Sequence, residues 1–264
     1  MAHLLSTINM NIAEIYWFSL ALLTAAAAGL VGSFALLKKA VLAGDAMSHI
    51  ALPGLGLAIL FKINPLIGGA MTLFLGTLLI WQLQKTTGLS TDAMIGVIFA
   101  TSLALGALIT PNEDLIEALF GGFGRMTLGE FLIGVSGALF VIGFILRYKN
   151  KLILALFSPD LAAVSNIDVN RLNLYFLLIF SLAIILGLRF LGALLVGALL
   201  IIPAAIGRQL THTLCLFLTI SSIAGMVAVG AGSVISSFYG LAAGPTIICV
   251  AAAVFVISLA KKQI

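Results

Sequence analysis

Charged residues are scarce in this chain, and their scarcity excludes a water-soluble globular fold. Asp, Glu, Lys and Arg together make up only 8% of the residues, whereas 62% are hydrophobic. Soluble domains carry about 25% charged residues. A core formed in water could not bury this much apolar surface, so we expect the chain to fold in a lipid bilayer. Its 264 residues suit one compact domain, and we expect residues 1–264 to form a single membrane domain.

Signatures of catalysis and of nucleic-acid binding are also missing. The two cysteines, Cys215 and Cys249, lie in apolar segments, and their spacing fits neither a disulfide framework nor a zinc ribbon. The chain has no G-x-x-x-x-G-K-[ST] phosphate loop and no nucleophile–base set, so we expect no enzymatic activity and no ATP hydrolysis by that route. No basic run is interleaved with aromatic residues, which leaves nucleic-acid binding without support.

Long apolar runs are what the chain has instead. A membrane-spanning helix needs about 20 mostly apolar residues, and runs of this length predict an all-α, polytopic helix bundle. One segment, 191–207, is short, so we expect nine spanning helices, or eight without it. The candidates are 14–37, 41–61, 66–83, 92–110, 127–146, 170–188, 191–207, 213–235 and 243–260.

The positions of the basic residues orient this topology. With the N-terminus outside and nine alternating spans, ten of the 13 Lys and Arg residues fall in inner loops or at an inner C-terminus. Lys62, Arg125 and Arg189 fall outside. Cytoplasmic loops carry an excess of Lys and Arg. The bias therefore predicts an outer N-terminus and a cytoplasmic C-terminus, and it favours nine spans because the loss of one would break the alternation.

The stretch V-L-A-G-D-A-M-S-H-I-A-L-P-G, residues 41–54, places Asp45 and His49 inside an apolar span. Residues four apart lie on one face of a helix. A charged group at this depth costs about 2.5–3.5 kcal/mol on insertion scales, so it needs a partner. The pair could bond to each other, relay a proton, or bind a divalent metal ion through the carboxylate and the imidazole. The spacing alone leaves these three interpretations open.

Prolines are predicted to kink two of the spans. Pro53 lacks the N–H that would bond the carbonyl of His49, so the helix should kink there, and Gly54 loosens the same region. Irregular backbone at membrane depth is tolerated where it lines a cavity. A broken helix beside a liganding pair is how many transporters form a midplane site. Pro203 should kink its own span at Leu199 and could shape the same pathway, with ordinary packing as the alternative.

Asp45 and His49 are too few to hold a metal ion selectively. Zinc typically takes four ligands. A twofold homodimer with this face on its axis would supply two Asp and two His, and isologous dimers are the commonest oligomers. On the metal interpretation, we therefore expect both the site and the pathway at a subunit interface.

The longest polar interruption on the inner side contains F-S-P-D-L-A-A-V-S-N. Ser158 can cap a helix, Pro159 suits its first position, and Asp160 favours the positive N-terminal end. Asn166 is a plausible stop. These residues predict a short helix of about one to two turns near 158–164 on the cytoplasmic face. An ordinary connector is the alternative.

Further acidic residues have weaker signals. Glu113, Asp114 and Glu117 lie in an outer loop, where they could draw cations toward a pathway. A solvated loop with a capped short helix is the alternative. Asp92 is expected to cap the helix that it begins, and Glu130, near the outer end of its span, could face water.

Five blocks of this sequence resemble, in order and spacing, the permease subunits of bacterial zinc, manganese and iron ABC importers. They extend along most of the chain and do not separate zinc from manganese. The blocks are G-D-A-M-S-H-I-A-L-P-G at 44–54, T-D-A-M-I-G-V-I-F-A at 91–100, F-S-P-D-L-A at 157–162, F-L-G-A-L-L-V-G-A-L-L-I-I-P-A-A at 190–205 and A-G-P-T-I at 243–247.

The resemblance implies a multi-pass protein of the bacterial inner membrane that works as two copies. Its partners would be two ATP-binding cassette chains, which bind the ATP, and an extracytoplasmic metal-binding protein. No cofactor would be held permanently, because the divalent ion (Zn²⁺ or Mn²⁺, with iron as a further candidate) is cargo. Asp45 and His49 match the positions that the family associates with metal. Ser158 to Val164, Leu161 included, match the segment that docks on the ATPase.

Two other classes of protein stay open on the residues alone. A stand-alone secondary transporter could move cations against protons through the same pair, and it would also lack a phosphate loop. A membrane scaffold or receptor would leave metal accumulation unchanged when Asp45 and His49 are replaced by alanine.

Overall fold

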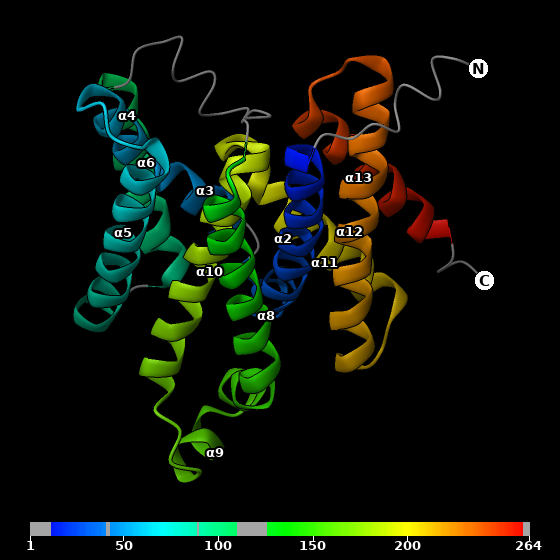
Figure 1. Ribbon diagram of the computed structural model, residues 1–264. Coiled ribbons are helices and arrows are strands. Elements are labelled where there is room, and N and C mark those ends of the chain that lie inside the picture. Colours follow the sequence, from blue (N-terminus) through cyan, green and yellow to red (C-terminus); the bar gives the residue numbers. More distant parts are fainter. Residues whose placement is uncertain (1–11, 41–42, 89, 110–125, 261–264) are drawn as a thin grey trace.

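The computed structural model is a bundle of α-helices (Figure 1). It describes residues 12–40, 43–88, 90–109 and 126–260. Those ranges contain helices and no strand, which confirms the all-α prediction. The helices are α2 (Ile12–Leu37), α3 (Ala43–Ile50), α4 (Leu52–Leu60), α5 (Pro65–Thr87), α6 (Thr91–Ile109), α8 (Leu128–Phe157), α9 (Pro159–Val164), α10 (Val169–Leu191), α11 (Ala193–Leu210), α12 (Leu214–Tyr239) and α13 (Ala243–Ala260).

Eight spans in the described ranges are long and apolar enough to cross a bilayer, with α3 and α4 counted together as one. The apolar part of α11, Val196–Leu210, is shorter. Two contacts nevertheless show that α11 runs through the bundle. Arg189 at the end of α10 meets Glu130 at the start of α8, whereas Cys215 at the start of α12 meets Lys149 toward the other end of α8. Because α11 joins α10 to α12, it returns the chain across the bundle and makes a ninth pass.

Helix α9 lies at one end of the bundle (Figure 1). Basic residues of several helices lie toward that end, which we call the basic end. The hydrogen bonds of Asn173, in the second turn of α10, show which other helix ends lie at the basic end. Asn173 accepts a hydrogen bond from Lys38, which follows α2, and donates one to Gln84 near the end of α5. The described residues with positive charge at this end are Lys38, Lys39, Lys85, Arg147, Lys149, Lys151, Arg171 and Arg208. Their distribution is the one that the alternating topology predicted.

Small residues let the central helices approach closely. A β-carbon at Gly29 of α2 would lie 2.6 Å from the Ser221 carbonyl oxygen of α12, and one at Gly225 of α12 would lie 2.8 Å from the Ala25 carbonyl oxygen. Side chains there would force the two helices apart. The small-residue runs of the sequence therefore act in packing, as is usual between membrane helices.

The short helix α9 begins and ends as the sequence predicted. Pro159 is its first residue, and it covers six residues. Asn166 adopts a left-handed φ of 56°, a conformation that asparagine tolerates at a helix end. One detail of the prediction is wrong: Ser158 stands at the N-cap position, but its side chain makes no capping hydrogen bond. The fixed φ of Pro159 and its missing N–H are enough to start the helix.

Candidate functional site

Asp45 and His49 lie one turn apart on α3, a helix of only eight residues. Helix α3 ends at Ile50, and α4 begins at Leu52 with Pro53 in its first turn. The amide of Ala51 instead reaches back three residues to the Ser48 carbonyl oxygen, at 3.3 Å. The break predicted from Pro53 is therefore present, directly after the polar pair.

His49 is buried, with 8% of its surface exposed. Its ring faces Phe99 of α6, with centroids 5.5 Å apart and planes tilted by 55°. The Nδ1 atom is fully buried and has no hydrogen-bond partner in the part of the chain that the structure describes. Leaving a buried polar atom unpaired costs about 1–3 kcal/mol. An imidazole nitrogen with no other partner is what a metal ligand requires.

Asp45 is half-buried, and its carboxylate also lacks an ion-pair partner. Among the described residues the ion pairs are Arg171–Asp168 and Arg189–Glu130, so neither a basic side chain nor His49 neutralises Asp45. The simplest of the three interpretations, a direct bond between Asp45 and His49, is thus not what satisfies the pair. Both groups remain available to a third partner.

Helix α11 sets the position of Asp45 by packing its backbone against α3. A β-carbon at Gly197 would lie 2.7 Å from Asp45 Cα and 2.9 Å from Asp45 Cβ. Only glycine permits this approach. Gly197 was not among the predicted site residues, and it is one of three glycines in the predicted span 191–207, so the sequence did not single it out. Phe99, the neighbour of His49, gave no signal that could distinguish it from other aromatic residues.

A cavity of about 430 Å³ lies between α3 and the basic end of the bundle. It reaches Ala43, two residues before Asp45, and its polar lining comes from three other stretches of the chain. The polar lining residues are Lys38, Ser90, Asp92, Asn170 and Asn173. The cavity therefore leads from the neighbourhood of the pair toward the end where α9 lies.

The remaining predicted residues lie elsewhere. Gly54 packs against the backbone of Gly68 in α5, where a β-carbon has no room. Pro203 lies inside the continuous helix α11 and faces α12, with its Cγ 3.6 Å from where a β-carbon of Gly225 would lie. The outer-loop acids Glu113, Asp114 and Glu117 fall outside the described residues.

The expectation that Asp92 caps its helix is wrong. At the start of α6 the capping acceptor is the Ser90 hydroxyl, which receives the Ala93 amide at 3.3 Å, and not Asp92. Ser90 precedes the helix, whereas Asp92 is already inside its first turn.

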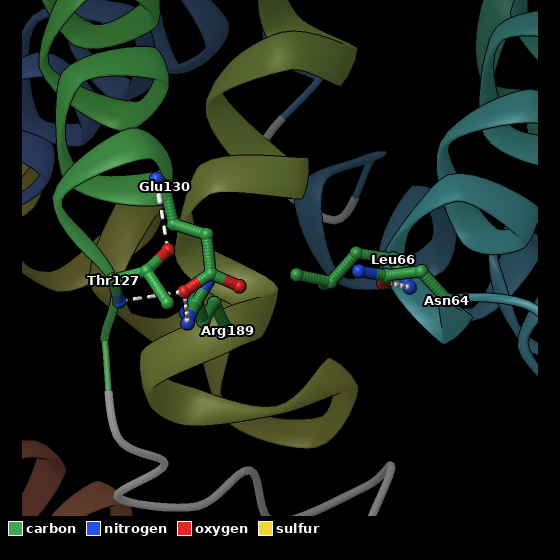
Figure 2. A network of polar contacts seen from close by, with 5 residues as sticks. All are labelled: Asn64, Leu66, Thr127, Glu130 and Arg189. Carbon is green, nitrogen blue, oxygen red and sulfur yellow. Dashed lines mark hydrogen bonds and ion pairs between the residues drawn. The ribbon is translucent and has the colours of Figure 1, made fainter.

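Glu130 faces water in part, with 36% of its side chain exposed, and it also binds two neighbours. Figure 2 shows its carboxylate between the Thr127 amide, at 2.9 Å, and the Arg189 guanidinium, at 3.0 Å. Thr127 accepts in return from the Glu130 amide and completes a capping box. The sequence distance between Glu130 and Arg189 hid this contact. In the same view Asn64 caps α5 by accepting from the Leu66 amide (Figure 2).

In the described ranges no three His, Cys, Asp or Glu side chains come together. Asp45 and His49 therefore have no third such side chain beside them in those ranges. The fold and this pair together define a polytopic membrane protein with a polar site on a broken span.

Comparison with known proteins agrees with this class. The model of the ABC 3 transport family matches residues 13–262, so the chain belongs to that family. It is a multi-pass protein of the inner membrane, and the resemblance read from the five sequence blocks is confirmed.

Two curated relatives cover nearly all of the chain. The high-affinity zinc uptake system membrane protein ZnuB of Haemophilus influenzae is 32% identical, over 88% of this chain and 91% of its own. The manganese transport system membrane protein MntC of Halalkalibacterium halodurans is 30% identical, over 90% of this chain and 83% of its own. The relatives are thus membrane proteins of zinc and of manganese systems.

A solved structure supports the fold. PsaBC from Streptococcus pneumoniae in complex with Fab superimposes with a TM-score of 0.83 at 26% identity, over 97% of this chain and 94% of that chain. An inward-facing metal-chelate type ABC transporter has a TM-score of 0.66 at 17% identity, over 90% of this chain and 85% of that one. The second similarity concerns the fold alone.

Proposed function

We propose that this chain is the permease subunit of an ATP-driven importer of divalent transition metal ions, zinc or manganese, with iron as a further candidate. It works as a homodimer with two ATPase chains and an extracytoplasmic metal-binding protein. Membership of the ABC 3 transport family and the names of the zinc and manganese relatives support this proposal.

The observation that carries the metal assignment is the state of Asp45 and His49. The imidazole Nδ1 is buried without a partner, and the carboxylate one turn away forms no ion pair in the described ranges. A carboxylate oxygen and an imidazole nitrogen suit zinc, manganese and ferrous iron. Binding requires neutral His and ionised Asp, so protons compete with the metal for the site.

Two such pairs make a complete site. A twofold axis beside α3 brings two carboxylates and two imidazoles together, which matches the four ligands that zinc takes. The ion passes from the binding protein to this shared site and leaves through the cavity that runs from Ala43 toward the basic end.

Helix α9 is the part that docks on the ATPase. Its Leu161 and Val164 are 58% and 82% exposed, and Phe157 just before it is 68% exposed. Apolar side chains at a water-facing end of a membrane protein indicate a surface that a partner covers. ATP is bound by that partner. The positive-inside rule makes the basic end cytoplasmic, which puts α9 on the side where the ATPase works.

The proposal is tested by uptake of radioactive zinc and manganese, in competition, into proteoliposomes that hold the chain, its ATPase partner and the binding protein. Asp45→Ala and His49→Ala should each lower uptake by about tenfold or more, since first-row metals lose one of few ligands. His212→Ala is the matched control, because His212 is exposed in the turn between α11 and α12.

Two outcomes would replace the proposal. Uptake that proceeds without ATPase chains and follows a proton gradient would make the protein a proton-coupled secondary transporter. Uptake unchanged by either alanine variant would remove the pair from the pathway.

A further inference from the structure

Lys38 stands at the junction between α2 and the helix that carries Asp45. It follows the last residue of α2 and donates from Nζ to the Asn173 side-chain oxygen at 2.7 Å. Its ammonium group also lies over the Phe176 ring, 4.3 Å from the centroid. Two contacts thus hold Lys38 on α10. The segment that starts at Lys38 reaches the first residue of α3, Ala43, five positions later.

Asn173 connects Lys38 to α9 through a rigid turn. The Ser165, Asn166 and Ile167 amides bond back to the Leu161, Ala163 and Ala162 carbonyls at 3.0, 3.1 and 2.9 Å. Asp168 then caps α10 by accepting the Arg171 amide at 3.0 Å. The three amides after α9 and the cap of α10 are thus hydrogen-bonded, so α9 and the first turns of α10 should move as one body.

The same end of α10 is tied to α5. Asn173 Nδ2 donates to Gln84 at 3.4 Å, and the Trp81 indole donates to the Asn170 carbonyl at 3.2 Å. Lys38 supplies a hydrogen-bonded link from α10 to the segment that leads to α3, beside the direct packing of α10 on α2 and α3. The cavity of about 430 Å³ lies beside the contact between Lys38 and Asn173, which we call the joint. The joint therefore has room to move.

We propose that Lys38 and Asn173 are positioning residues, whose hydrogen bond passes the movement of α9 to α3 and so to Asp45. This inference rests on the proposed function, in which the ATPase moves α9. Neither residue binds the metal. When the joint is intact, displacement of α9 by the ATPase pulls the start of α3 and opens the cavity below Asp45.

The electrostatic surroundings make the joint sensitive to alkaline pH. Burial lowers the pKa of Lys38 from 10.5 to about 8. Asp92 lines the same cavity from α6 without forming an ion pair with Lys38 in the described ranges. Helix α8 contributes only apolar lining, and α10 presents Asn173 and Phe176. A charge-assisted hydrogen bond is roughly twice as strong as a neutral one, so the joint weakens when Lys38 loses its proton.

Two other charged side chains at this end of the bundle are engaged elsewhere, while Lys39 follows Lys38 directly in the chain. Lys85 of α5 lies over the Trp81 ring at 3.9 Å, and Arg171 of α10 pairs with Asp168. Asp45 is the first acidic residue that α3 presents beyond Ala43. Lys38 is therefore the group whose titration should govern this contact.

The test measures metal uptake and ATP hydrolysis in proteoliposomes that contain the chain, its ATPase partner and the binding protein. Asn173→Ala should lower uptake by about tenfold while ATP hydrolysis and co-purification with the ATPase stay within about twofold of wild type. Asn150→Ala is the matched control, because Asn150 is exposed on α8. Equal uptake by Asn173→Ala and wild type would overturn the inference, as would a parallel loss of uptake, hydrolysis and co-purification.

A pH series separates coupling from a merely structural role. Between about pH 7 and about pH 9, uptake per ATP hydrolysed should fall several-fold in wild type and stay level in Lys38→Arg, because arginine keeps its charge. Asn173→Asp, which gives the ammonium a carboxylate partner, should move the fall to higher pH. A fall of the same size in Lys38→Arg and wild type would overturn the inference. If wild type fails to couple uptake to ATP at any pH, the proposed function fails instead.

Discussion

Gly197 of α11 lies directly against Asp45 of α3, so close that a β-carbon at 197 would come within 2.7 Å of Asp45 Cα. The two residues belong to different helices and are 152 positions apart in sequence. Because Gly197 has no side chain, α11 can approach α3 closely, and this contact sets the position of Asp45, the candidate metal ligand. This relationship makes α11 part of the site although it supplies no ligand.

Replacing Gly197 with alanine should push α3 away from α11. Overpacking of this kind costs about 1–3 kcal/mol, and here the displaced element carries Asp45. We expect a lower unfolding temperature in detergent together with strongly reduced metal uptake. Gly96→Ala is the control, because a β-carbon at Gly96 of α6 meets nothing within 4 Å. Similar behaviour of the two variants would show that α3 and α11 are not in tight contact in the membrane.

Lys38 should make the folded protein more stable as the pH rises above about 8. Burial lowers the pKa of Lys38 in the folded chain to about 8 from 10.5. Between these values the unfolded chain binds more protons than the folded one, so the free energy of unfolding increases with pH. Thermal unfolding across this range should show the increase in wild type. It should be smaller in Lys38→Gln, with Lys151→Gln, on an exposed residue of α8, as the control.

Deprotonation of Lys38 should change the stability of the fold and the strength of its bond to Asn173 in opposite directions. Deprotonation of this residue favours the folded state, yet it weakens the charge-assisted bond to Asn173. A loss of coupling at alkaline pH without a loss of stability would therefore come from the joint and not from unfolding. A rise in stability of equal size in Lys38→Gln would show that other groups dominate this range.

Glu130 and Arg189 should be energetically coupled. Their side chains are 36% and 23% exposed and 3.0 Å apart, and pairs of this exposure contribute about 0.2–1 kcal/mol. We expect a coupling energy toward the upper end of that range in a double-mutant cycle of Glu130→Gln and Arg189→Gln. Glutamine at 130 keeps an oxygen that can accept from the Thr127 amide, so the cycle isolates the ion pair. Additive effects of the two substitutions would contradict the coupling.

Helix α9 should lose its partner when its exposed apolar face is charged. Val164 is 82% exposed, so Val164→Asp disturbs no packing within the chain. We expect co-purification with the ATPase chains and metal uptake to be lost while the unfolding temperature is unchanged. Asn150→Asp adds the same charge on an exposed residue of α8 and should retain both. Normal ATPase binding by Val164→Asp would exclude α9 as the docking element.

Local signals in the sequence predicted elements more reliably than side-chain partners. The break near Pro53 and the end of α9 at Asn166 followed from backbone rules that act within a few residues. In contrast, the sequence predicts Asp92 as the cap, whereas Ser90 provides it. Three consecutive residues that can cap a helix, Ser90, Thr91 and Asp92, leave the helix start ambiguous. The partner of Glu130 could not be predicted, because Arg189 lies 59 positions away.

The sequence by itself determined that this protein is a membrane-embedded bundle of helices. Apolar runs of spanning length have no other stable state in a bilayer, where each backbone polar group must be satisfied within its own helix. It also placed Asp45 and His49 on one face, since the helical repeat fixes that geometry. Only the tertiary structure decided that Gly197 seats Asp45, that Phe99 covers His49 and that Lys38 reaches Asn173. Those contacts depend on how separate helices pack against each other, and no local rule links residues that meet only after the bundle has formed.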